Sequence, residues 1–364
     1  MLWRETPLLY SKHLSDRLGS EYAVYLKLEN LQPAHSFKSR GVSHFIRRQL
    51  EIHGSQLHAI CASGGNAGLA AAAASQALGV KCTIYLPEGV DSGTHHYLAA
   101  LEAEVIVGGT VYGEALLAAE NAVANEENAV LVPAYEDEII WEGHSTMIAE
   151  VHAQLEQAPD AIFCSVGGGG LLGGVLMGCY TVGWDRVPIF ALETHGSNCF
   201  FESIAANEGD IPAAPDNVTI RTDDFHGVKV ARLHKLTSKA TSLGASEASA
   251  GVVKMALSHA GGVKSITIPD QMSMRTVKSF ADDHKMLVEL ACATALAPAY
   301  APGLMQTLVP PVPNRSRVIV IIVCGGFKIS ADDLAVYAEV VGQDMSTAWT
   351  VRLGGGREVH MAKW

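Results

Sequence analysis

The sequence predicts an α/β protein of two domains, each built on an open, mostly parallel sheet flanked by helices. Short apolar runs alternate with longer amphipathic stretches, which is the pattern of βαβ units. The apolar runs are continuous rather than alternating, as expected of strands that are buried on both faces. At 364 residues the chain is also long enough to fill two hydrophobic cores.

The apolar runs give the candidate strands in chain order. They cover residues 58–63, 81–87, 103–109, 129–134, 161–167, 187–193, 265–270 and 317–326. Amphipathic segments between them predict helices at residues 69–79, 112–128, 143–156 and 273–290. Residues 206–226, rich in Pro, Asp and Asn, are expected to form a surface excursion. The C-terminal residues 345–364 contain a triple glycine and are expected to be a tail or an extension of a sheet edge.

Composition excludes several classes of function. A formal net charge of −12, with no cluster of Lys and Arg, argues against a nucleic-acid partner and leaves small molecules as the expected ligands. No apolar run is long enough for a secretory signal or a membrane span, so we expect a cytoplasmic protein without a membrane partner. The seven cysteines are odd in number and lack CxxC spacing, which argues against a zinc site or a disulfide framework.

The richest glycine motif is SVGGGGLLGG, residues 165–174, at the junction of a predicted strand and helix. Glycines let the backbone wrap closely around an anion, so that successive N–H groups converge on a phosphate. The same stretch also satisfies GxGxxG through Gly168, Gly170 and Gly173, and Glu193 follows at the end of the next strand. A dinucleotide site for a nicotinamide-dependent oxidoreductase is therefore an alternative, as is simple packing of a helix on a strand.

Two further junctions carry polar groups. In ASGGNAGLA, residues 62–70, Ser63 and the glycine amides suit a carboxylate, and Asn66 suits a phenolic oxygen, although both side chains also suit helix capping. In VCGGF, residues 323–327, the Cys324 thiol suits an aromatic nitrogen or simple core packing.

The stretch HSFKSRG, residues 35–41, begins a predicted helix but places Lys38 and Arg40 in its first turn. Cations there oppose the helix dipole, whose positive end favours anions. The position of Lys38 therefore calls for a function.

Taken in order, HSFKSRG, SGGNAG, GGGGLLGG and CGG resemble the pyridoxal-phosphate enzymes of the tryptophan synthase β type. The resemblance is strongest to the serine/threonine dehydratase branch, and above all to L-serine dehydratase. It extends from TPLLYS near the N-terminus to the helix after CGG, and includes IIWEGH, ALETHG and DDHKMLVELACATALA. It implies a homodimer with the cofactor between a small domain, residues 35–135, and a large domain of residues 1–34 and 136–364.

The resemblance also implies the roles of individual residues. Lys38 would form an imine with pyridoxal 5'-phosphate, and Phe37 would pack against the cofactor ring. The other implied cofactor contacts are the phosphate loop of Gly167, Gly168, Gly169, Gly170 and Leu171, Asn66 at the ring hydroxyl, and Cys324 at the pyridine nitrogen. The implied contacts of the substrate carboxylate are Ser63, Gly64, Gly65 and Ala67. A monovalent cation such as K⁺ is implied near Glu193, Ser197, Leu243 and Ala245.

The implied reaction is β-elimination of L-serine to pyruvate and ammonia, with some L-threonine converted to 2-oxobutanoate. Lys38 would remove the α-proton, which requires a pKa lowered by burial or by neighbouring charge. Cys324 favours a serine dehydratase, because relatives that act on threonine or form cysteine more often have serine there.

Three positions depart from the family pattern: His35 replaces a glycine, Phe327 a small polar residue, and Cys199 a serine. His35 is expected either at the surface or narrowing the pocket. Threonine dehydratase, another β-elimination or β-replacement enzyme, and a catalytically idle binding protein remain alternatives.

Overall fold

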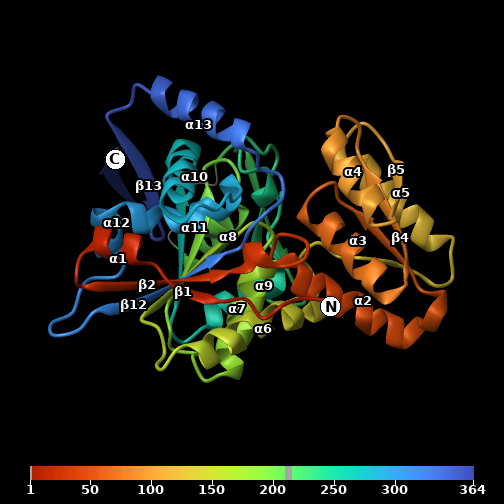
Figure 1. Cartoon of the computed structure of the whole chain (residues 1–364), viewed down its shortest axis with the longest axis horizontal. Coiled ribbons are helices and arrows are strands. Elements are labelled where there is room, and N and C mark those ends of the chain that lie inside the picture. Colours follow the sequence, from red (N-terminus) through yellow and green to blue (C-terminus); the bar gives the residue numbers. More distant parts are fainter. Residues whose placement is uncertain (1, 210–214) are drawn as a thin grey trace.

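A computed structural model describes residues 2–209 and 215–364. Within these residues it contains an eight-stranded sheet, a four-stranded sheet and a two-stranded ribbon. Figure 1 shows the two larger sheets in separate lobes, with the four-stranded sheet and helices α3 to α5 forming the smaller one.

The larger sheet has the strand order β1-β2-β12-β7-β8-β11-β13-β14. Its five inner strands, β2, β12, β7, β8 and β11, run parallel to one another. At the edges, β1, β13 and β14 pair antiparallel. In β12, residues 319–323 are fully buried, which explains their continuous apolar sequence. The bounds are β1 (Leu8–Tyr10), β2 (Tyr22–Leu28), β7 (Ala161–Ser165), β8 (Ile189–Thr194), β11 (Val263–Ile268), β12 (Arg317–Val323), β13 (Ala348–Leu353) and β14 (Arg357–Ala362).

The smaller sheet has the order β5-β4-β3-β6 and is parallel throughout. Its strands are β3 (His58–Ala62), β4 (Lys81–Leu86), β5 (Glu104–Val107) and β6 (Ala129–Leu131). Its helices are α3 (Asn66–Leu78), α4 (Ser92–Ala100) and α5 (Tyr112–Ala124). We propose that the two sheets correspond to the two domains with the boundaries expected from the sequence.

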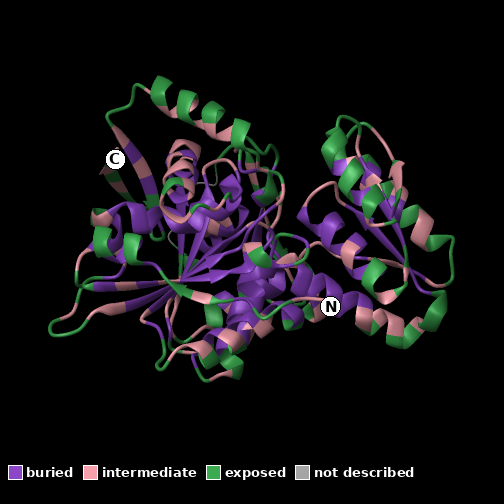
Figure 2. Ribbon diagram, viewed as in Figure 1, coloured by how far each residue is buried: buried purple, intermediate pink, exposed green. Residues whose placement is uncertain are grey.

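Helix α2 (Lys38–His53) packs against both α3 and α6, so it contacts both lobes. The other helices accompany the larger sheet: α1 (Lys12–Leu18), α6 (Glu138–Gln154), α7 (Gly170–Thr181), α8 (Cys199–Glu208), α9 (Ala250–Ser258), α10 (Asp270–His284), α11 (Leu290–Tyr300), α12 (Pro302–Leu308) and α13 (Ala331–Gln343). Every residue of α11 is buried, whereas α13 lies on the surface (Figure 2).

Strands occur at all of the predicted positions, but one predicted helix is wrong. The segment 273–290 is not continuous, because α10 ends at His284 and α11 begins at Leu290. Lys285 takes a left-handed conformation with φ of 58°, which ends α10. The intervening residues lead into Glu289, which has extended backbone immediately before α11.

The predicted surface excursion at residues 206–226 is also more ordered than expected. It contains the end of α8 and the strand β9 (Val218–Asp223), which pairs with β10 (Val228–Leu233). Residues 210–214 lie outside the described part of the chain. Near the C-terminus, β13 and β14 form the edge extension that was one of the two expectations for residues 345–364.

Candidate active site

A cavity of about 620 Å³ lies between the two sheets. Part of its wall is formed by residues that directly follow the strands β3, β7 and β12, as expected where the carboxyl ends of parallel strands meet a ligand. All residues predicted to contact the cofactor or the substrate carboxylate line it: Phe37, Lys38, Ser63, Gly64, Gly65, Asn66, Ala67, Gly167, Gly168, Gly169, Gly170, Leu171 and Cys324.

Lys38 is the first residue of α2 and reaches the cavity beside Phe37. Its Nζ donates a hydrogen bond of 2.7 Å to the carbonyl of Ala134. Burial lowers the pKa of Lys38 to about 8, because a charged ammonium is poorly solvated there. A lysine with this pKa is partly neutral near physiological pH and can act as a nucleophile or a base.

The segment before Lys38 is fixed to the loop after β12. Phe37 N–H donates to the Cys324 carbonyl at 3.1 Å, and Gly326 N–H donates to the His35 carbonyl at 2.8 Å. His35 is exposed, has a φ of 56° and is absent from the cavity wall formed by the described residues. It is therefore a surface histidine, and its left-handed backbone explains why a glycine suits the position.

The glycine loop between β7 and α7 is packed so closely against its neighbours that it leaves no room for side chains. A Cβ atom on Gly168 would approach the Tyr135 ring to 2.5 Å, and one on Gly167 would approach Leu243 to 3.1 Å. Gly169 has a φ of 105°, which side chains rarely allow. Because α7 begins here, its first N–H groups have no acceptor within the helix and can bind an anion.

Pyridoxal phosphate fits this cavity, because the free N–H groups at the start of α7 lie at its wall and can bind the phosphate. The hydroxyls of Ser36 and Ser165 also line the cavity, and both are buried without a hydrogen-bond partner among the described residues. Such polar groups are costly to bury unless a ligand or water satisfies them. The cavity therefore has both a phosphate site and unused hydrogen-bonding groups.

Cys324 also lines the cavity and directly follows β12. A hydrogen bond with Cys292, together with burial, raises the pKa of the Cys324 thiol well above its ordinary value. The thiol is therefore protonated and uncharged at neutral pH. This suits the role predicted from the sequence, in which a neutral group beside the pyridine nitrogen would limit protonation of the ring.

Asn66 begins α3 and is held on both sides of its amide. Its Oδ1 accepts a hydrogen bond from Phe327 N–H at 3.2 Å, and its Nδ2 donates to Glu289 at 3.1 Å. The Phe327 ring packs against Tyr97, and Phe327 is not among the described residues of the cavity wall. Nearby, Gly65 N–H donates to the Ser63 hydroxyl at 3.2 Å.

Several residues of the cavity wall were not predicted, including Tyr112, Tyr135, Ser242, Glu289 and Lys328. Glu289 has a sequence signal, because it is an acid placed between two apolar runs. The others lie in loops or near helix starts that only the tertiary structure brings together.

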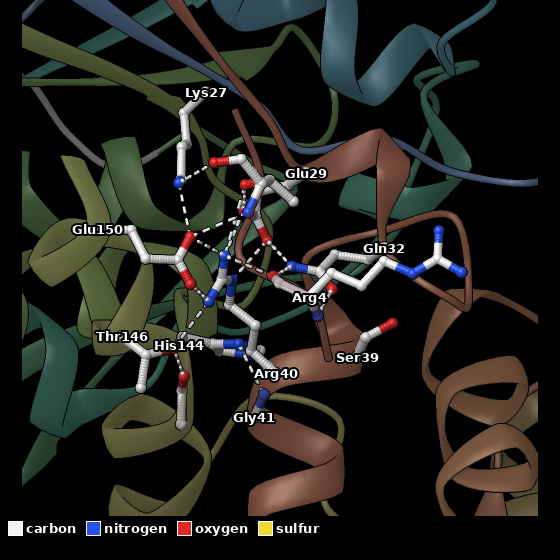
Figure 3. A network of polar contacts seen from close by, with 12 residues as sticks. Arg4, Lys27, Glu29, Gln32, Ser39, Arg40, Gly41, His144, Thr146 and Glu150 are labelled. Atoms are coloured by element: carbon white, nitrogen blue, oxygen red, sulfur yellow. Dashed lines mark hydrogen bonds and ion pairs between the residues drawn. The ribbon is translucent and has the colours of Figure 1, made fainter. Parts of the chain in front are cut away.

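Arg40, two residues after Lys38, is the centre of a buried ion network (Figure 3). Its guanidinium donates to Glu29 at 2.7 and 2.8 Å and to both oxygens of Glu150 at 2.6 Å. Lys27 also donates to Glu150 at 2.6 Å. Burial disfavours the charged guanidinium, but the two carboxylates outweigh it and raise the pKa of Arg40. The network anchors the first turn of α2, and thus Lys38, to β2 and α6.

His144 supports the same turn from α6. Its Nδ1 accepts a hydrogen bond from Gly41 N–H at 3.1 Å, and its ring packs on Phe37 with centroids 4.8 Å apart. Burial, with the nearby charges of Lys38 and Arg40, lowers the pKa of His144 well below its ordinary value. His144 is therefore a neutral packing residue beneath Phe37.

The residues predicted to hold a cation are only partly brought together at the cavity. Leu243 and Ala245 line it, whereas Glu193 and Ser197 are not among the described residues of its wall. The Ser197 hydroxyl donates to the Leu243 carbonyl at 2.7 Å, and Cys199 lies 3.7 Å from the Gly167 carbonyl. Among the described residues there is no group of three or more His, Cys, Asp or Glu side chains suited to a metal ion.

Glu193 is fully buried and accepts hydrogen bonds from the N–H groups of Phe200 and Phe201, at 3.0 and 2.6 Å. Burial raises the pKa of Glu193 well above its ordinary value. Because its carboxylate is already bound and does not face the cavity, it is poorly placed to hold a ribose. A Cβ atom on Gly173 would approach Trp141 to 2.9 Å, so this glycine serves helix packing rather than a dinucleotide.

Comparison with known proteins identifies the class to which this fold and cavity belong. The sequence model of the pyridoxal-phosphate dependent enzyme family matches residues 1–325. The chain therefore belongs to this family. No helix in the described ranges is both long and apolar enough to pass through a bilayer.

Individual relatives are similar over almost their whole length. The chain is 38% identical to a human serine dehydratase-like protein over 93% of this chain and 94% of that protein. It is 36% identical to human L-serine dehydratase/L-threonine deaminase over 93% and 95% of the two chains. The crystal structure of an L-serine ammonia-lyase from the fungus Rhizomucor miehei matches with a TM-score of 0.81 at 32% identity, covering 93% of this chain and 98% of the fungal one.

Proposed function

We propose that the protein is a pyridoxal-phosphate-dependent L-serine dehydratase, an ammonia-lyase that converts L-serine to pyruvate and ammonia and also accepts some L-threonine. The observation that carries this proposal is the cavity shared by Lys38, the glycine loop, residues 63–67 and Cys324. The names of the similar human and fungal proteins support the same substrate class.

When bound, pyridoxal phosphate supplies an electron sink that stabilises negative charge at the α-carbon of an amino acid. Lys38 holds the cofactor and then, as a neutral amine with a pKa near 8, takes the α-proton. The hydroxyl of Ser63 and the backbone N–H groups of Gly64, Gly65 and Ala67 bind and orient the substrate carboxylate. The apolar side chains of Val90 and Leu236, which line the same cavity, reduce the access of water.

The test is an assay of 2-oxo acid release across a panel of β-hydroxy amino acids. We expect pyruvate from L-serine, a smaller yield of 2-oxobutanoate from L-threonine, and no product with Lys38→Ala. Release from L-threonine alone would favour the threonine dehydratase alternative. A cofactor-loaded protein that is inactive on the whole panel would instead indicate an idle binding protein.

We also propose that a monovalent cation binds behind the phosphate loop, held by Glu193 and the carbonyls of Ser197, Leu243 and Ala245. The support is the contact of the Ser197 hydroxyl with the Leu243 carbonyl, together with the full burial of the Glu193 carboxylate, whose charge a cation would balance. We expect activity in K⁺ buffer to exceed activity in tetramethylammonium buffer at equal ionic strength. Equal activity in the two buffers would contradict the proposal, and Glu193→Gln is expected to weaken the response to K⁺.

We propose further that the enzyme is a homodimer in the cytoplasm. The resemblance to the dehydratase family supports the dimer. All seven cysteines are free and buried, which suits a reducing compartment.

A further inference from the structure

We propose that Glu289 is a positioning residue, which fixes the Asn66 amide so that an N–H group faces the phenolic oxygen of the cofactor. This inference rests on the proposed cofactor site and adds a residue that the sequence motifs did not assign. Both side chains line the cavity and both are largely buried, with exposed fractions of 9% for Asn66 and 5% for Glu289.

The first step is the orientation of the amide. Asn66 Oδ1 accepts from Phe327 N–H at 3.2 Å, while Nδ2 lies 3.1 and 3.3 Å from the two Glu289 oxygens. A 180° flip of the amide would set Nδ2 against the Phe327 donor and Oδ1 against the carboxylate. Both contacts would then be repulsive, so only one orientation is compatible with the surroundings.

The second step is the hydrogen atom that remains. A primary amide has two N–H groups, and Glu289 needs only one of them. The other contact of Nδ2 is with the Ser242 hydroxyl at 3.4 Å, which is long for a hydrogen bond. A cofactor oxygen in the cavity can therefore take this N–H at little cost.

The third step is the support of Glu289 itself. Its carboxylate accepts from Lys328 N–H at 3.0 Å and from the Ser242 hydroxyl, in addition to Asn66. It precedes the first turn of α11, where the helix dipole favours a negative charge. A Cβ atom on Gly326 would overlap the carboxylate, so the loop after β12 is shaped around it.

The test measures the dissociation constant of pyridoxal phosphate for Glu289→Ala, Asn66→Ala and the double variant, using purified full-length protein. If Glu289 acts through Asn66, each single change weakens binding about tenfold, and the double change is no worse than Asn66→Ala. The visible absorption band of the bound cofactor is expected to shift in the same direction in all three proteins.

Glu289→Gln separates hydrogen bonding from charge. Its oxygen can still accept from Asn66 and Lys328, while its nitrogen can donate to the Ser242 oxygen. We therefore expect a dissociation constant of the cofactor within about threefold of the wild-type value, since the hydrogen-bond geometry is retained. Glu127→Ala, which removes an exposed acid far from any motif, is the control and should leave binding unchanged.

Two results would overturn the inference. One is a double variant in which the two losses of cofactor affinity multiply. The other is Glu289→Ala with the cofactor affinity and absorption of the wild type. Both differ from a failure of the proposed function. A wild-type protein that binds the cofactor but releases no 2-oxo acid contradicts the dehydratase proposal alone. The measurements on Glu289 use only cofactor affinity and absorption, so they still decide the role of this residue.

Discussion

At the scale of the residue, Lys38 illustrates how its surroundings change the chemistry of a side chain. An exposed lysine is almost entirely charged at neutral pH. Here burial lowers the pKa to about 8, and the Ala134 carbonyl takes one hydrogen bond from the amine. The cation that seemed misplaced at a helix start is thus a partly neutral amine that faces the cavity.

This pKa predicts how the rate of cofactor reconstitution depends on pH. Only the neutral amine attacks the cofactor aldehyde, so the rate should rise about tenfold per pH unit below pH 8 and level off above it. Stopped-flow absorbance of apoprotein mixed with pyridoxal phosphate measures this rate. A rate that kept rising beyond pH 10 would mean that Lys38 has an ordinary pKa.

At the scale of the element, α2 depends on a polar network that its sequence alone does not reveal. Arg40 is fully buried, and its two carboxylate partners lie outside the helix, Glu29 at 11 and Glu150 at 110 residues from it in the sequence. Gly41 allows the close approach of His144, because a Cβ atom there would come within 2.5 Å of the imidazole. The placement of Lys38 therefore depends on contacts with β2 and α6.

Arg40→Met should destabilise the fold strongly, since it leaves Glu29 buried without its cation. We expect the free energy of unfolding to fall by about 3–5 kcal/mol, measured by urea denaturation. Arg48→Met is the matched control on the same helix, because the Arg48–Glu51 pair is exposed. The control should cost no more than about 1 kcal/mol. If both variants lost the same free energy of unfolding, the network would not be what supports α2.

The site residues that directly follow an apolar run were the easiest to predict from the sequence. The glycine loop, residues 63–67 and Cys324 each follow an apolar run, so their position at a strand end could be inferred locally. The strand β2 was missed because Lys27 interrupts its apolar pattern. Lys27 is fully buried and its ammonium is held by Glu150 of α6, a partner that no local pattern indicates. Tyr135 was missed for the same reason, whereas the signal of Glu289, an acid between two apolar runs, was not interpreted as part of a site.

At the scale of the whole molecule, the prediction of an α/β fold with continuous apolar strands was correct, and family membership supports the cofactor. The helix predicted at 273–290 failed because amphipathic character persisted through a break that one left-handed residue creates. The β9–β10 ribbon was missed because four of the six residues of β9 are polar and none of the six is buried, so the strand has no apolar run. Neither failure affects the cavity, whose wall is set by the buried strands.

The strand order of the larger sheet also constrains when the site can form during synthesis. The strand β12 lies inside the sheet, between β2 and β7, but is the last of the parallel strands to leave the ribosome. Until residues 317–323 are available, the edges of β2 and β7 that face β12 have no partner. Cys324 and Gly325 are also missing from the cavity wall. Folding must therefore await contacts between the two ends of the chain, which slows it. Cofactor uptake by a nascent chain would thus report that β12 has paired with β2 and β7.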